Sequence, residues 1–186
     1  MFPAQQLSFD ALAREISQPL LRYLQRCVGD RTVAEDLLQE TLIRIARGLP
    51  GFDGRASVKT WAFAIATRIT ADYFRKPDRR FQIVEVDEAA DLADTDRAID
   101  DRVVVDEMNA CVRQVIDSLP EDYRAALVLH DLEGLNAQQV AEICACSLAT
   151  AKIRIHRARR RLRGALQQQC DFYRDGDNEF RCDRKA

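Results

Sequence analysis

The chain lacks the features that mark several classes of protein. None of its apolar runs approaches the roughly 18 residues of a membrane span. The first ten residues show no basic stretch followed by an apolar core, so we expect no secretory signal peptide and no membrane insertion. Only two histidines occur, and there is no Ser/His/Asp set, phosphate-binding loop or metal-ligand motif. These absences predict a cytoplasmic protein that is not an enzyme and has no catalytic residue.

Glycine and proline are also scarce, with seven and five among 186 residues, and strand-like alternation is missing. Hydrophobic residues make up 47% of the chain, which is enough for packed cores. We therefore predict an all-α fold, with two small helical domains joined by an acidic flexible linker and a helix-turn-helix in the second domain. The six cysteines of a cytoplasmic chain are more often reduced thiols, metal ligands or redox groups than disulfides.

Charge is separated along the chain although the net charge is only −2. Residues 85–107 carry ten acids against two arginines, whereas residues 147–163 carry seven cations and no acid. Helical periodicity fades where the acids gather, which is typical of a linker. We predict an N-terminal helical domain at 1–78, the acidic linker at 79–104, a helix-turn-helix domain at 105–167 and a cysteine-containing tail at 168–186.

Residues 135–163 are the strongest local signal and indicate two short helices joined by a turn near Ala145–Cys146. Asn136 and Gln139 occupy capping-box positions for the first helix, and Ser147 can cap the second. The second helix has one apolar stripe, made of Leu148, Ala151, Ile155, Ala158 and Leu162, and its remaining surface is basic. Such a helix can enter a major groove of DNA. A solvated basic face, or an RNA or membrane patch, is the alternative.

The N-terminal part also reads as helices. A first helix over residues 8–28 should be broken or kinked at Pro19, end at Gly29 and be followed by a helix capped by Asp30. That next helix has an apolar face and a second face with Asp36, Gln39, Glu40 and Ile43. An Ile among polar residues hints at a docking surface, and a solvated face with one stray apolar residue is equally consistent.

A further helix, from Ser57 to about Arg75, mixes aromatic and cationic residues. Trp61, Ile65, Ile69 and Tyr73 can face the core, while Lys59, Arg68 and Arg75 lie elsewhere. Aromatic rings interleaved with cations can stack on and hold unpaired bases. The alternative, that the aromatics are simply core, is the better interpretation for Trp61 and Tyr73. For the loop at 52–57 both interpretations stay open.

Three stretches occur in a specific order with the acidic segment between the last two. They are GDRTVAEDLLQETLIRI, with its D-x-x-Q-E-T core, SVKTWAFAIATRITADYFRK, and LPEDYRAALVLHDLEGLNAQQVAEICACSLATAKIRIHRARRRLR. Together they resemble the extracytoplasmic-function (ECF) sigma factors, over about residues 8–167. The resemblance implies a specificity subunit of bacterial RNA polymerase that recognises promoter DNA and directs transcription initiation. It further implies a stress or envelope response under the control of an anti-sigma factor.

The resemblance also assigns residues. The polymerase-binding face would be Asp36, Gln39, Glu40 and Ile43, docked on core RNA polymerase. The minus-ten element would be captured by Phe52, Ser57, Lys59, Trp61, Arg68 and Arg75. The minus-thirty-five element would be bound by Thr150, Lys152, Arg154 and Arg157 in the major groove, with Arg160, Arg161 and Arg163 at phosphates. His156 would donate to a phosphate or pack against the preceding helix. Arg68 stands where many relatives have Asn, so the minus-ten base preference does not transfer.

The cysteines leave other possibilities open. Cys144 and Cys146 fit a core position and the turn better than a metal pair, and Cys27 and Cys111 lie on apolar faces. In the tail, Cys170 and Cys182 supply half of a tetrahedral zinc site. The tail is then a packed extension, a redox or metal switch, or an anti-sigma contact. The rival functions are a helix-turn-helix regulator that acts on duplex DNA alone and a thiol- or metal-responsive sensor.

Overall fold

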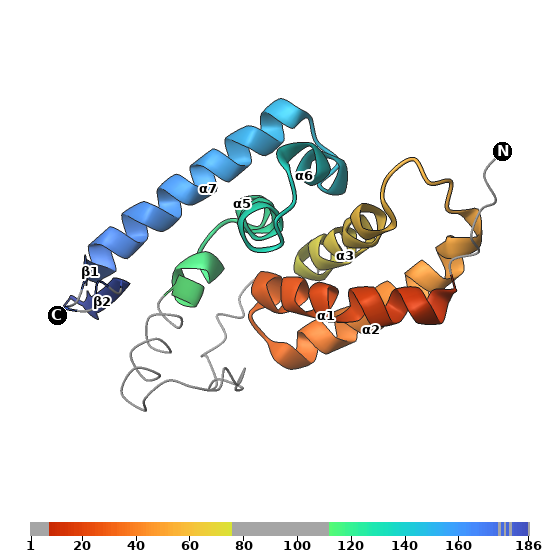
Figure 1. Ribbon diagram of the computed structural model, residues 1–186, viewed down its shortest axis with the longest axis horizontal. Coiled ribbons are helices and arrows are strands. Elements are labelled where there is room, and N and C mark those ends of the chain that lie inside the picture. Colours follow the sequence, from red (N-terminus) through yellow and green to blue (C-terminus); the bar gives the residue numbers. More distant parts are fainter. Residues whose placement is uncertain (1–7, 76–111, 175, 177, 179, 186) are drawn as a thin grey trace.

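The computed structural model describes residues 8–75, 112–174, 176, 178 and 180–185, with the backbone alone for 180–184. The predicted linker and Cys111 lie outside these residues. The described elements are α1 (Phe9–Val28), α2 (Arg31–Gly48), the short η1 (Leu49–Gly51), α3 (Val58–Arg75), helical residues 112–117, α5 (Glu121–Leu127), the π-helical η3 (Val128–Leu132), α6 (Ala137–Ile143), α7 (Leu148–Gln169), β1 (Cys170–Arg174) and β2 (Phe180–Arg184). The all-α prediction is confirmed for the body of the molecule, and the terminal hairpin is an addition to it (Figure 1).

Helix α1 is continuous, so the predicted break at Pro19 was wrong. Proline in a helix interior removes one backbone hydrogen bond and clashes with the preceding turn. Burial offsets that cost, because Leu12 and Ile16 before the proline and Leu20 and Leu24 after it are all buried on one side of α1. One unbroken helix keeps that apolar stripe in register with the core.

The N-terminal helices pack around aromatic contacts between α1 and α3. The rings of Tyr23 and Phe63 meet edge to face with centroids 5.3 Å apart, and the Tyr23 hydroxyl lies 2.8 Å from the Thr67 hydroxyl. The turn before α2 forms as predicted, with Gly29 at a φ of 76° and the Asp30 carboxylate accepting from the Val33 N–H at 2.9 Å. These local signals fix where α1 ends and α2 begins.

The helix-turn-helix also has the predicted caps. The Gln139 N–H donates to the Asn136 side chain at 3.0 Å, the Gln139 side chain accepts from the Asn136 N–H at 2.9 Å, and Ser147 accepts from the Thr150 N–H at 3.1 Å. The buried stripe of α7 is Ala151, Ile155 and Ala158, flanked by the partly buried Leu162. Leu148 does not belong to the stripe, since 38% of it is exposed. It is the first residue of α7 and follows directly on the cap.

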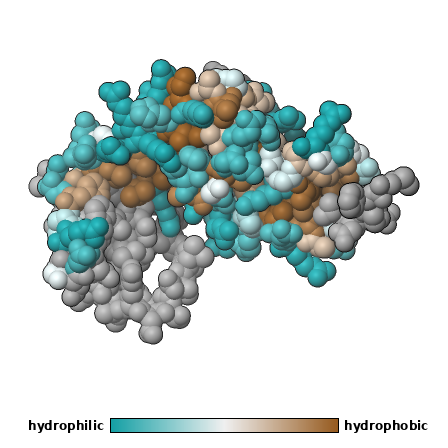
Figure 2. Space-filling view, turned by 45° about the horizontal axis from the view of Figure 1, so that its top comes forward, coloured by the Kyte–Doolittle hydropathy of each residue, from teal (hydrophilic) through white to brown (hydrophobic). Residues whose placement is uncertain are grey.

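The two halves of the molecule pack against each other. Helix α3 contacts α6, and the end of α1 contacts η3 and α5. Arg26 of α1 pairs with Glu133 at 2.8 Å, and Arg124 of α5 donates to the carbonyl oxygen of Cys27 at 2.6 Å. One core of buried residues therefore runs through both halves. On the face in Figure 2, hydrophilic side chains project from much of the described surface, with apolar residues visible between them.

A two-stranded antiparallel hairpin ends the chain beyond α7 (Figure 1). Its register pairs Cys170 with Arg184 and Phe172 with Cys182. The Lys185 N–H donates to the Gln169 carbonyl at 2.8 Å, and the Lys185 ammonium donates to the Gln167 carbonyl at 2.8 Å. Cys170 is only 3% exposed. The described backbone of the tail thus forms a hairpin that follows α7, while a metal at Cys170 and Cys182 stays a prediction.

Candidate nucleic-acid interface and docking face

Helix α7 presents a basic surface opposite its buried stripe. Because an α-helix turns about 100° per residue, Ala149, Ile153, His156 and Arg160 lie on the side away from Ala151, Ile155 and Ala158. All four of these outward residues are exposed, as are Lys152 and Arg163 beside them. This outward surface of α7, defined by Ala149, Ile153, His156 and Arg160, is open over several helical turns.

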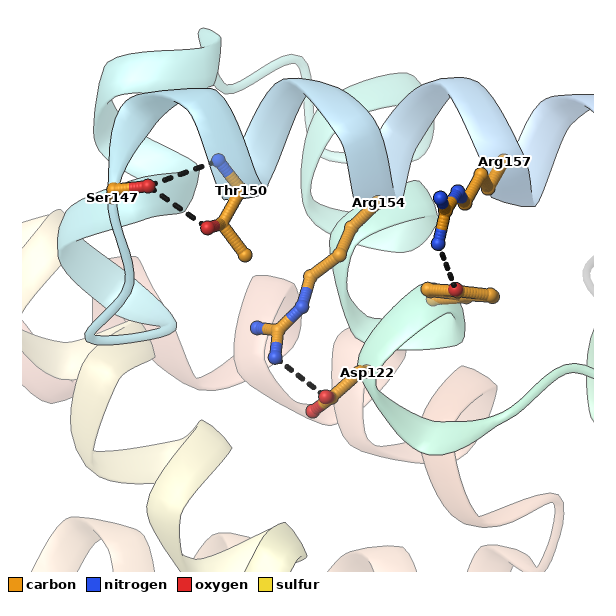
Figure 3. A network of polar contacts seen from close by, with 6 residues as sticks. Asp122, Ser147, Thr150, Arg154 and Arg157 are labelled. Atoms are coloured by element: carbon orange, nitrogen blue, oxygen red, sulfur yellow. Dashed lines mark hydrogen bonds and ion pairs between the residues drawn. The ribbon is translucent and has the colours of Figure 1, made fainter.

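Two of the arginines predicted to bind in the major groove of DNA contact residues of α5 in the structure. The Arg154 guanidinium pairs with the Asp122 carboxylate of α5 at 2.5 Å, and the Arg154 side chain is 22% exposed. The Arg157 guanidinium donates to the Tyr123 hydroxyl at 3.4 Å (Figure 3). That hydrogen bond is the main cause of the lowered pKa of the Tyr123 phenol. Both side chains therefore contact α5.

The other residues of α7 predicted to bind DNA also fall into two groups, one facing outward and one facing α5. Arg161 stacks over the Tyr123 ring at 5.0 Å, on the α5 side. The hydroxyl of Thr150 lies 2.8 Å from that of Ser147, within the cap (Figure 3). The structure thus places Lys152, His156 and Arg160 outward, and Arg154, Arg157 and Arg161 toward α5.

The cations of α7 are not all unopposed, contrary to the count within residues 147–163. Asp122 faces Arg154, and the Asp131 carboxylate accepts two hydrogen bonds from the Arg159 guanidinium, one of them at 2.9 Å. The Asp131 hydrogen bond also raises the pKa of Arg159. Arg159 therefore anchors α7 to η3 rather than adding to a nucleic-acid surface.

Helix α3 carries the predicted minus-ten residues on two different sides. Trp61, Arg68 and Arg75 are seven residues apart, so they follow one side of the helix. The Trp61 ring packs on Phe52 with centroids 5.0 Å apart, and Ser57 accepts from the Thr60 N–H at 3.0 Å as the cap of α3. Lys59 lies on the other side, with its ammonium 5.8 Å from the centre of the Phe63 ring.

The expected core face of α3 is only partly as predicted. Ile69 is buried, whereas Trp61, Ile65 and Tyr73 are half-buried. The fully buried positions are instead Thr60, Ala62, Phe63, Ala66, Ile69 and Thr70. Small residues dominate this list because α3 packs closely on both its neighbours, α1 and α2, and on α6. Among the aromatic residues of α3, Phe63 is therefore in the core, whereas Trp61 and Tyr73 lie at its rim.

Helix α2 has one buried and one exposed face, as its periodicity predicts. Ala34, Thr41 and Ile45 are fully buried, and the Thr41 hydroxyl donates to the Leu37 carbonyl at 2.7 Å. Asp36, Gln39, Glu40 and Ile43 are all exposed, with Ile43 at 46%. Glu40 pairs with Arg44 at 2.8 Å across one helical turn. The D-x-x-Q-E-T core thus divides into the structural Thr41 and three exposed polar residues, and the exposed Ile43 lies just beyond it on the same face.

Comparison with known proteins identifies the family. Residues 12–80 match the model of sigma-70 region 2, and residues 109–162 match that of sigma-70 region 4. The RNA polymerase sigma-H factor of Pseudomonas aeruginosa is 34% identical over 167 residues, which cover 86% of each chain. The ECF RNA polymerase sigma factor SigC of Mycobacterium tuberculosis is 32% identical over 155 residues, which cover 82% of this chain and 80% of that one. The chain belongs to the ECF family of RNA polymerase sigma factors.

Solved structures show the same fold as this sigma factor. One is the sigma factor RpoE of Bartonella quintana in complex with the anti-sigma factor NepR, with a TM-score of 0.69 and 24% identity over 86% of this chain and 96% of that chain. Another is CnrH in complex with the cytosolic domain of CnrY, with a TM-score of 0.65 and 21% identity over 89% and 91% of the two chains. At these identities the likeness concerns the fold.

Several residues of the sigma factor's surface escaped the sequence reasoning. Three arginines of α7 contact residues about 30 positions away in the sequence, namely Asp122, Tyr123 and Asp131. No local sequence pattern predicts such pairings. Ile153 did have a signal, because it falls outside the apolar stripe of α7 and so has to face solvent. Within the described part of the chain, no three His, Cys, Asp or Glu side chains are grouped so as to hold a metal ion. No described helix combines the length and apolar character needed to cross a membrane.

Proposed function

We propose that this sigma factor binds core RNA polymerase through Asp36, Gln39, Glu40 and Ile43 of α2. The observation that carries the proposal is the division of α2. Its opposite face holds the buried Ala34, Thr41 and Ile45, while the four docking residues are exposed and include one Ile. A polar face with one exposed apolar side chain fits a docking surface, which buries apolar area and leaves charges at its rim. We expect a complementary basic and apolar surface on the polymerase.

Promoter DNA is the second partner in this proposal. The half-buried Trp61 and Phe52 offer ring faces beside Arg68 and Arg75, an arrangement that suits stacking of unpaired bases of the minus-ten element. The outward surface of α7 enters the major groove at the minus-thirty-five element, with Lys152, Arg160 and Arg163 near phosphates. Arg154, Arg157 and Arg161 contact DNA after exchanging their α5 partners for it, at the modest cost of a surface pair.

The remaining parts of the proposed function follow from the family. The chain acts in the cytoplasm as a non-catalytic specificity subunit, and an anti-sigma factor, as in the complexes of RpoE with NepR and of CnrH with CnrY, regulates it. Occlusion of the exposed α2 face is the simplest way for such a partner to act, because the same residues would then be unavailable to the polymerase.

Reconstitution tests the proposal. The purified chain is mixed with core RNA polymerase, and association is measured by gel filtration for the wild type and for Asp36→Arg/Gln39→Ala. The matched control is Glu15→Arg/Gln18→Ala, since these exposed α1 residues have the same spacing and receive the same changes. We expect a stable complex for the wild type and the control, and its loss in the α2 variant. Equal binding by both variants would exclude the α2 face, and no complex at all with tight binding of free duplex DNA would favour an ordinary helix-turn-helix regulator.

A further inference from the structure

Ile153 is an apolar residue in the middle of a basic surface. It is 50% exposed, the largest fraction among the exposed large hydrophobic side chains of the described residues. On α7 the exposed His156 and Arg157 lie three and four positions beyond it, and the exposed Lys152 directly precedes it. Single exposed apolar residues are common on proteins, so exposure alone assigns no role. Its position on the helix is what gives it one.

Helix geometry places Ile153 at the centre of the outward surface of α7. It lies two residues from both Ala151 and Ile155, which are buried, so its side chain points away from the core. It is the sixth residue of the helix that follows the turn. In helix-turn-helix proteins the N-terminal residues of this helix contact base edges. With α7 in the major groove, as proposed, Ile153 would face the base edges.

The arginines that could compete for this position are turned aside. Arg154 is paired with Asp122 and Arg157 contacts Tyr123, both on the α5 side (Figure 3). One turn before Ile153 the outward residue is Ala149, which is also apolar and exposed. The part of the outward surface nearest the helix start is thus apolar, and its cations lie beside it or farther along the helix.

The major groove offers one apolar group to such a surface, the C5-methyl group of thymine. A branched side chain such as Ile has few rotamers, so it presents a fixed shape to that group. We infer that Ile153 contacts a thymine methyl group in the minus-thirty-five element and sets a preference for thymine at that position. This inference rests on the proposed promoter binding by α7 and adds a residue and a base to it.

Deoxyuridine provides a test, because it replaces thymine with loss of the methyl group alone. The full chain in complex with core RNA polymerase first selects duplexes from a pool randomised in the minus-thirty-five region. Each thymine of the selected element is then replaced singly by deoxyuridine, and the affinity is measured for the wild type, Ile153→Ala, Ile153→Val and Leu132→Ala. Leu132 is a control apolar residue on η3 with 45% exposure.

We expect one thymine whose replacement weakens wild-type binding about three- to fivefold, the effect of one buried methyl group. The effect should disappear in Ile153→Ala and persist in Ile153→Val and Leu132→Ala. Circular dichroism and thermal unfolding of each variant check that it stays folded.

Three outcomes would overturn the inference while leaving promoter binding intact. They are a selected element without thymine, equal affinity for thymine and deoxyuridine at every position, and a deoxyuridine effect that is unchanged in Ile153→Ala. The inference also fails if Ile153→Ala weakens assembly with the polymerase and keeps the thymine preference. Failure to enrich any sequence would instead reject the promoter-binding proposal, and this inference with it.

Discussion

At the scale of single residues, the position of the Trp61 ring is set by its contacts with Phe52 and Gly48. One side of its indole packs on Phe52, and its far edge lies over Gly48 at the end of α2. A Cβ atom at position 48 would lie 2.9 Å from Cζ2 of Trp61, which is closer than van der Waals contact permits. Gly48 is therefore needed for the close approach of the ring, and the pair Phe52–Trp61 depends on it.

We predict that Gly48→Ala displaces the Trp61 ring. Trp61 is the sole tryptophan of the chain, so its fluorescence reports the change directly. We expect a red shift of the emission and weaker capture of unpaired minus-ten DNA by the holoenzyme. Gly51→Ala is the matched control, because a Cβ at position 51 would meet nothing within 4 Å. The same emission maximum in both variants would contradict the prediction.

At the scale of the elements, the turn between α6 and α7 sets the position of the whole basic helix. The capping box of Asn136 and Gln139 begins α6, and Ser147 begins α7. Between them Ala145 has a φ of 49°, in the left-handed region that residues with a Cβ atom adopt at a cost of roughly 1 kcal/mol. The turn is therefore held by its two caps and by the packing of α6 on α7, against local strain.

Because Ala145 is strained, we predict that the same Ala→Gly change stabilises the protein at position 145 and destabilises it at position 149. Ala145→Gly should raise the free energy of unfolding by about 0.5–1 kcal/mol, because glycine adopts a positive φ without steric cost. Ala149→Gly, four residues on in the first turns of α7, should lower it by a similar amount, since glycine weakens a helix. Urea unfolding of both variants measures the two changes. A loss of stability in Ala145→Gly would show that the left-handed residue carries little strain.

For the molecule as a whole, the decisive contacts join the two halves. Glu133 is 5% exposed in its side chain and pairs with Arg26, which is 38% exposed. Arg124 donates to the carbonyl oxygens of Cys27, Asp117 and Leu119, with the Leu119 contact at 3.1 Å. These contacts use the end of α1, the last turn of α5, which carries Arg124, and Glu133 directly after η3. The proposed surfaces of α2 and α7 lie elsewhere, so packing of the halves leaves them exposed.

Reversal of the charge at Arg26, the partner of the buried Glu133 carboxylate, tests this packing. Arg26→Glu should lower the free energy of unfolding by about 1–3 kcal/mol, because Glu133 would lose its partner and face a like charge while almost excluded from water. The exchange Arg26→Glu/Glu133→Arg should recover much of the loss. Thermal and urea unfolding measure stability, and small-angle scattering measures whether the halves separate. If the single variant is as stable as the wild type, the pair does not hold the halves together.

The sequence by itself determined the parts of this sigma factor that depend on near neighbours. Caps at Asp30, Asn136 and Ser147, the end of α1 at Gly29 and the two faces of α2 follow from residues three or four positions apart. The three sequence motifs, in their order along the chain, also indicated the ECF family, which the comparisons confirm. The division into four segments and the assignment of binding residues stay predictions.

Only the tertiary structure decided which surfaces are free. Pro19 stays inside one helix because residues distant in sequence bury both of its flanks. Arg154 and Arg159 gain carboxylate partners about 30 positions away, and a charge count within one window does not contain those partners. The hairpin of Cys170–Arg174 and Phe180–Arg184 likewise depends on pairing across a turn. Local signals fix the elements, whereas long-range packing and pairing decide which of their side chains remain for polymerase and DNA.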